Sequence, residues 1–288
     1  MHDTLSGIPG GRLECTLERS AFDAIQTWFD EYTEAFQLPE AKHQRFITMK
    51  IDHTRHVLRE IRDLAGSVEL NCGGKRLAGA IALLHDVGRF EQYRRYRTFS
   101  DLDSEDHAEL GIKLIREHGV LRGIGEYTRN LILHAVSRHN KIRLARHRIP
   151  EYTLFARLLR DADKLDILRI VVTHYQEKEK PEGGELGLGL SRDPAISASV
   201  LKSFLSGRMV RSADIKTLND LKILQIGWIY DLNFPLTLRK IKRLNYLERI
   251  FETLPQTEQT VRVYRKIGGN QAFTAPPVSP AIRFFSMK

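Results

Sequence analysis

The stretch LAGAIALLHDVGRF, residues 77–90, decides the fold and points to the chemistry of this chain. It is apolar around much of a helical circumference, and its small residues allow neighbouring helices to approach closely. A central helix is therefore predicted here, and it ends in His85 and Asp86. An imidazole nitrogen beside a carboxylate oxygen is a donor pair that suits a divalent metal ion, and a carboxylate can also bridge two ions.

Composition limits the class of protein. The chain has 288 residues, 42% of them hydrophobic, which suffices for one large domain or one domain with an appendage. A formal net charge of +9 indicates an anionic partner without saying which kind. Only Cys15 and Cys72 are present, so neither a disulfide framework nor a thiolate metal cage is expected. The N-terminus lacks the features of a signal peptide, and no stretch approaches the roughly 20 apolar residues of a membrane span. A cytoplasmic protein without membrane contact is expected.

Helical periodicity runs along most of the chain and strand alternation is rare, so the sequence predicts an all-α fold. Residues 1–40 are expected to form an N-terminal helical extension, and residues 41–180 the core of a helical bundle. Residues 181–288 are expected to form additional C-terminal helices. These helices either pack on the core or form an oligomer surface, and a homodimer is one expectation.

Several ligand-type side chains lie on apolar faces of predicted helices. His53 is in the middle of an apolar stripe and should be buried. His139 continues the apolar face of a helix over 126–138, whereas His134 is rotated from it by about 140°, at about 100° per residue. Both reach one cavity only if the helix loosens near its end or if metal ions lie between the two directions. Asp163 shares a face with core residues, where an unpaired carboxylate is costly, so a metal ion is its expected partner and Asp166 a supporting group.

The motifs follow one another as HTRHV at 53–57, HDVG at 85–88, HAELG at 107–111, HAVSRHN at 134–140 and DADKLD at 161–166. In this order they resemble the HD-domain superfamily of metal-dependent phosphohydrolases, in the form that has additional histidines. The resemblance covers residues 45–180. It implies two divalent ions, drawn from Mn, Fe, Mg, Ni and Zn. The implied ligands are His53, His85, Asp86 and Asp163 for the first ion, and His107, His134 and His139 for the second, with Asp86 bridging.

The resemblance also implies hydrolysis of a small phosphate ester, a nucleotide or phosphodiester, by metal-activated water. Phosphoryl transfer needs positive charge and positioning, so Arg89 and Lys164 are candidate catalytic groups beside Asp86, and Arg89, Arg94 and Lys141 are candidates for substrate binding. Cyclic-di-GMP hydrolysis is disfavoured because the adjacent histidines and the Gly-Tyr-Pro signature of that subgroup are absent. Two alternatives stay open. One is a di-iron oxygenase on the same scaffold, and the other is a non-catalytic regulatory protein that binds nucleotide or nucleic acid.

Overall fold

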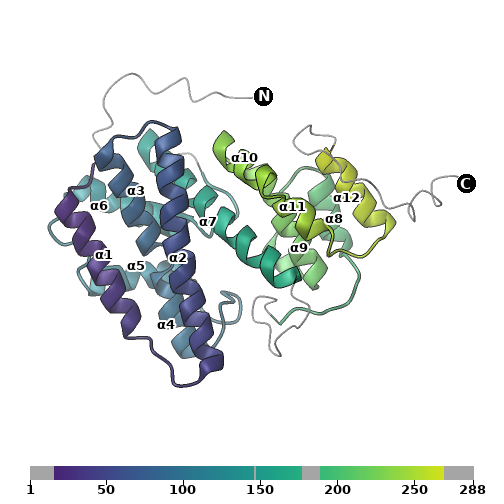
Figure 1. Cartoon of the computed structure of the whole chain (residues 1–288), viewed down its shortest axis with the longest axis horizontal. Helices are drawn as coiled ribbons and strands as arrows, with labels where there is room; N and C mark the ends of the chain where they lie inside the picture. Colours follow the sequence, from purple (N-terminus) through teal and green to yellow (C-terminus); the bar gives the residue numbers. More distant parts are fainter. Residues whose placement is uncertain (1–15, 146, 177–188, 269–288) are drawn as a thin grey trace, which may run out of the picture. The chain divides into compact units, whose positions relative to one another are not determined.

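The computed structural model describes residues 16–145, 147–176 and 189–268, and it confirms the all-α prediction (Figure 1). In these ranges the chain forms helices and no sheet, apart from one isolated bridge between Ser191 and Thr217. No helix in them is long and apolar enough to cross a bilayer. The chain divides into two compact units, Met1–Ile167 and Leu168–Lys288. The boundary predicted at residue 180 lies outside the described residues.

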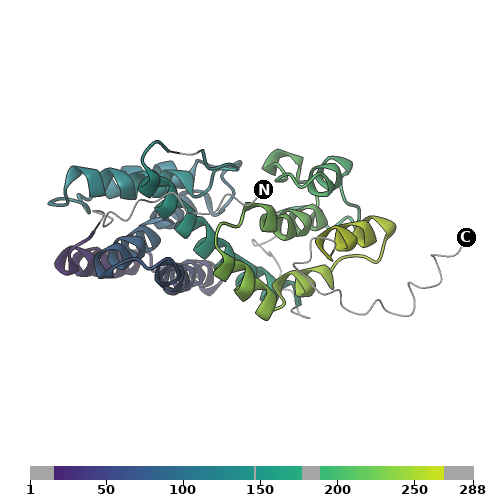
Figure 2. The same cartoon turned by 90° about the horizontal axis from the view of Figure 1, so that it is seen from above.

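The N-terminal unit is built around α3 (Cys72–Leu84), in which every residue from Leu77 to Leu84 is buried. Helices α1, α2 and α6 all contact α3, α2 also packs on α4, and α4 packs on α5. Seen from above, the purple and dark blue helices lie on one side of the unit and the teal helices on the other (Figure 2). The helices around α3 are α1 (Arg19–Glu34), α2 (Ala41–Ser67), α4 (Val87–Tyr96), α5 (His107–Glu117), α6 (Glu126–Arg138) and the first part of α7 (Pro150–Gln176).

Two glycines allow the close approach of these helices. A Cβ on Gly79 in α3 would lie 3.0 Å from the Phe22 ring and 3.1 Å from the Leu58 side chain. At Gly88 in α4 the constraint is stronger, because a Cβ would lie 2.1 Å from the carbonyl oxygen of His107. Atoms at that distance overlap, so only glycine lets α4 lie directly against the start of α5.

The helical path breaks at the His-Asp pair. His85 keeps right-handed helical backbone angles after the end of α3, whereas Asp86 leaves them, with φ −109° and ψ 14°. Helix α4 then begins at Val87. The next helix, α5, starts after Asp106, whose carboxylate accepts hydrogen bonds from the backbone N–H groups of Ala108 and Glu109. This cap fixes the first residue of α5, His107, opposite the α3–α4 joint.

The C-terminal unit consists of short helices after the last turns of α7. Helix α8 packs on α9 and on α12, and α11 packs on α9 and α10. Asp220 organises the start of α9: its buried carboxylate accepts from the backbone N–H groups of Ser197, Lys216 and Thr217 and forms a capping box with Thr217. The helices are α8 (Ala198–Leu205), α9 (Leu218–Gly227), α10 (Pro235–Arg243), α11 (Tyr246–Phe251) and α12 (Glu258–Gly268), with the 3₁₀ turns η2 (Ser212–Asp214) and η3 (Trp228–Asp231).

Candidate metal centre

Ligand-type side chains from five helices or helix ends meet inside the N-terminal unit. They form two groups, and within each group the nitrogen and oxygen atoms that could bind a metal ion lie within 4.8 Å of one another. All the members are buried except Asp163, whose side chain is 15% exposed. The first group is His53, His85 and Asp163; the second is Asp86, His107 and His139.

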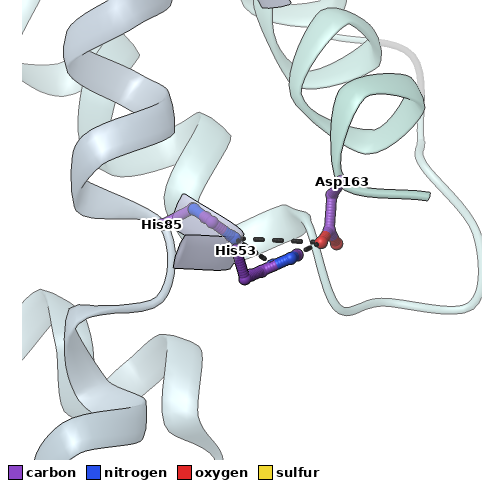
Figure 3. A group of neighbouring side chains, drawn as sticks. All are labelled: His53, His85 and Asp163. Carbon is purple, nitrogen blue, oxygen red and sulfur yellow. Dashed lines mark hydrogen bonds and ion pairs between the residues drawn. The ribbon is translucent and has the colours of Figure 1, made fainter. Parts of the chain in front are cut away.

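The first group joins α2, the end of α3, and α7 (Figure 3). The Nε2 atom of His53 lies 3.1 Å from Asp163 Oδ1 and 3.3 Å from the Nε2 atom of His85. His85 Nε2 lies 3.8 Å from the same Asp163 oxygen. Two nitrogens and one carboxylate oxygen therefore converge on one point.

The second group has the same form. The Nε2 atoms of His107 and His139 lie 3.0 Å apart. They are 3.4 and 3.6 Å, respectively, from Oδ1 of Asp86. The other oxygen of Asp86, Oδ2, is 3.6 Å from the Nε2 atoms of both His53 and His85. Asp86 thus presents one oxygen to each group, which is the placement that a bridging carboxylate needs.

Each of the four rings is fixed through its other nitrogen, and the pattern repeats in the two groups. His53 Nδ1 donates to Asp166 Oδ2 at 2.7 Å, and His107 Nδ1 donates to Asp101 Oδ2 at 2.7 Å. His85 and His139 donate from Nδ1 to the main-chain carbonyls of residues 82 and 136, both at 2.7 Å. Because each Nδ1 carries the hydrogen, each neutral ring offers a lone pair at Nε2. Each group contains one ring held by a carboxylate and one held by a carbonyl.

Paired lone pairs at 3.0–3.3 Å repel each other unless a cation lies between them. Burial lowers the pKa of His85 to about 4 and that of His107 to about 3, so these rings are neutral at pH 7. Burial opposes ionisation of Asp86, but its polar and charged neighbours, first among them the Lys50 ammonium, outweigh burial and hold the Asp86 pKa well below its usual range. Neutral imidazoles and ionised carboxylates are the forms that bind metals, so these side chains fit a pair of divalent ions.

Comparison with known families agrees with this geometry. Residues 51–168 match the family described as HD domain. This segment is an HD domain. Proteins of this family are usually metal-dependent phosphohydrolases. No curated protein and no solved structure matches the chain.

His134, which the sequence predicts as a ligand of the second ion, lies in neither ligand group of the HD domain. The His134 ring packs against the rings of His147 and Tyr152, with each centroid 5.1 Å away. The reason lies in the helix: His139 keeps helical angles of φ −65° and ψ −36°, so α6 does not loosen before it. Two side chains five residues apart on such a helix point in different directions.

The cations predicted to bind phosphate have different surroundings. Arg89 lies beside the site, with Nε 3.7 Å from Asp86 Oδ1, but its Nη1 donates to Asp101 Oδ1 at 2.8 Å. Lys141 pairs with Asp106 at 2.5 Å, and Lys164 is buried with partners of its own. Arg94 is directed elsewhere in the N-terminal unit, onto Glu91 and the ring of Phe36. It follows Arg89 by five residues on α4 and therefore projects from another side of that helix.

Three further residues support the site and were not anticipated as functional. Lys50 donates to Asp86 Oδ2 at 2.7 Å, and its position one turn before His53 on α2 was the available signal. Asp101, in the loop before α5, binds His107, Arg89 and Gln92. Arg160, on α7 one turn before Asp163, donates to the carbonyls of residues 138, 139 and 141 and thereby holds the end of α6.

A third group of ligand-type atoms, Asp101, Asp106 and His107, overlaps the second one. Its charges are already satisfied: Arg89 pairs with Asp101, and Lys141 with Asp106. Asn140 bridges them, donating to Asp106 at 2.9 Å and lying 3.4 Å from Asp101. This cluster therefore orients His107 through its Nδ1 atom, which is the usual role of a carboxylate bound to a metal-ligating histidine.

Proposed function

We propose that the HD domain is a metal-dependent phosphohydrolase that hydrolyses a small phosphate ester, of the nucleotide or phosphodiester class. The observation that carries the proposal is the position of Asp86 between two ligand groups, each with two converging imidazole nitrogens. Ions bound at such a pair of sites supply Lewis acidity to a phosphoryl oxygen and lower the pKa of a water molecule.

The residues of the chain have defined tasks in this reaction. His53, His85 and Asp163 would hold the first ion, His107 and His139 the second, and Asp86 both. Lys50 and Arg89 add positive charge at the two oxygens of Asp86, where a phosphate dianion would approach the ligand groups. Since phosphoryl transfer depends mainly on positioning and charge, this cationic setting favours a phosphate ester over a neutral substrate.

The di-iron oxygenase remains the alternative, because four imidazoles and carboxylates also suit iron. Metal analysis of protein purified without chelators or metal-affinity resin, followed by activity assays, separates the two functions. We expect two metal equivalents per chain and metal-dependent release of phosphate or alcohol from a panel of nucleotides and p-nitrophenyl esters. Asp86→Ala should abolish both metal binding and turnover, whereas Asp103→Ala, at an exposed position in the loop before α5, should alter neither. Iron-loaded protein that consumes dioxygen and hydrolyses no ester would replace the proposal with the oxygenase.

A further inference from the structure

The positive charge of the chain is concentrated in the C-terminal unit. Residues 189–268 contain fourteen Lys and Arg and seven Asp and Glu, whereas the whole chain contains 45 and 36. This segment therefore contributes +7 of the net +9 with less than a third of the residues. The excess is separate in sequence from the HD domain and from the cations around its ligand groups.

Most of this charge lies at the surface. Among the exposed side chains of residues 189–268, ten are Lys or Arg and three are Asp or Glu. On α10, Arg239, Lys242 and Arg243 are exposed, and their spacing of three and four residues places them on one face. Thr237 and Ile241 on the same helix are buried. Helix α10 thus anchors one side in the unit and presents guanidinium and ammonium groups on the other.

A second basic surface lies on α12 and α8, which pack against each other (Figure 1). Arg262 and Arg265 are exposed on α12, and Lys202 is exposed on α8. None of the ten exposed cations of this unit forms an ion pair with another described residue. Ten exposed cations beside only three exposed acidic side chains favour an anionic partner for the described part of this unit.

The chemistry of the surface selects among anionic partners. A membrane-bound helix needs an exposed apolar face, and a protein interface usually has an apolar or aromatic centre. Within residues 189–268, Leu244 is the one large hydrophobic side chain that is exposed, with 41% of its surface accessible. Seven of the ten exposed cations are arginine, whose planar guanidinium matches a phosphate group in two hydrogen bonds. We infer that the C-terminal unit binds the phosphate backbone of nucleic acid, without reading base sequence.

This inference does not rest on the hydrolase proposal, and the full chain tests it. Fluorescence anisotropy would measure binding of a labelled 25-base-pair DNA duplex and a single-stranded RNA of equal length, over a series of salt concentrations. We expect affinity to fall steeply with salt, because each neutralised phosphate releases counterions. Asp86→Ala should bind as well as the unchanged protein, which separates this surface from the metal centre.

Charge reversal locates the surface. Arg239→Glu, Lys242→Glu and Arg243→Glu together should weaken duplex binding at least ~10-fold and reduce the slope of log affinity against log salt by about three, at about one per phosphate contact. A second variant, Arg262→Glu with Arg265→Glu, covers the case in which the first does not fold. The matched control reverses three exposed cations of the HD domain, Lys75, Arg116 and Arg122, and should change affinity less than twofold.

Three results would overturn the inference. The first is no binding of either nucleic acid at low salt. The second is an equal loss in the α10 variant and the control, which would mean that only net charge matters. The third is binding to vesicles of anionic lipid or to an acidic peptide but not to nucleic acid, which would assign the surface to another class of partner.

Discussion

Asp101→Asn should selectively weaken the second metal ion. The Asp101 carboxylate lies 2.7 and 2.8 Å from Nδ1 of His107, whose Nε2 faces Asp86 and His139. A negative charge next to Nδ1 makes Nε2 a stronger electron-pair donor to a metal ion. It also offsets the positive charge that a bound ion places on the imidazole. The amide of Asn keeps the size of the side chain and one acceptor oxygen but removes the charge.

The surroundings of Asp101 set the size of the effect. Loss of a group that supports a metal ligand typically weakens metal affinity ~10- to 100-fold, which is about 1.4 to 2.7 kcal/mol. Here Arg89 Nη1 lies 2.8 Å from Asp101 Oδ1, and Gln92 also donates to that oxygen, at 2.9 Å. Because Arg89 already neutralises part of the charge, we expect the lower end of the range, about tenfold.

Isothermal titration of metal-free protein with Mn²⁺, combined with metal analysis after dialysis, would measure the two sites. Asp101→Asn should give one tight and one weakened site. Asp166→Asn, which changes the carboxylate behind His53, should weaken the other site instead. Asp103 lies in the same loop as Asp101 but is exposed, so Asp103→Asn serves as the control. Unchanged affinities in Asp101→Asn, or an equal loss at both sites, would refute the assignment of Asp101 to one ion.

Three other changes test the geometry of the HD domain. Gly88→Ala should lower the free energy of unfolding by ~3 kcal/mol or more, because the added Cβ meets the carbonyl of His107. This is at or above the upper end of the ~1–3 kcal/mol that is usual for overpacking. Urea denaturation would measure the loss, and Gly125→Ala is the control because a Cβ there would have no atom within 4 Å. Lys50→Met should tighten Mn²⁺ binding several-fold in calorimetry, since it removes the cation paired with Asp86 Oδ2, and looser binding would contradict this competition. Lowering the pH from 8 to 5 should release the first ion before the second. Burial opposes protonation of His53, but its bonds to Asp163 and Asp166 outweigh burial and raise its pKa, whereas the pKa of His107 is lowered to about 3. Protons therefore compete for the first site at higher pH, and metal content after equilibration at each pH would show the order.

Sequence periodicity was sufficient to predict much of this molecule. A stripe of apolar residues placed His53 on a buried face, and an almost wholly apolar segment placed His85 and Asp86 at the end of the central helix. These predictions depend on properties of single helices, which local sequence determines. For His134 the same periodicity predicts a direction about 140° from that of His139 on a regular helix, and α6 stays regular up to His139.

Other parts of the site depend on packing between segments. The side chain of Asp101 lies in an irregular loop, where no helical period indicates its direction, and its partner His107 begins the next helix. Arg160 is one of many arginines in the sequence, and its role arises only because the end of α6 lies against α7. Arg89 was predicted as a phosphate ligand from its place after the His-Asp pair. Its ion pair with Asp101 shows that it also positions the support of His107. Such contacts are long-range and cannot be derived from spacing.

The tautomers of the four histidines restrict how the centre can handle protons. Every Nδ1 hydrogen is used in a bond to a carboxylate or a carbonyl, and every Nε2 lone pair faces another ligand atom. With the pKa values of His85 and His107 lowered to about 4 and 3, these imidazoles are poor proton acceptors at pH 7. A general base near neutrality needs a pKa close to the working pH and a free nitrogen toward the substrate. His85 and His107 lack both, and the Nε2 atom of His53 faces Asp163 and His85 and not a free space. The metal-free HD domain should therefore be inactive rather than slow, because its histidines are arranged to hold cations and not to activate water themselves.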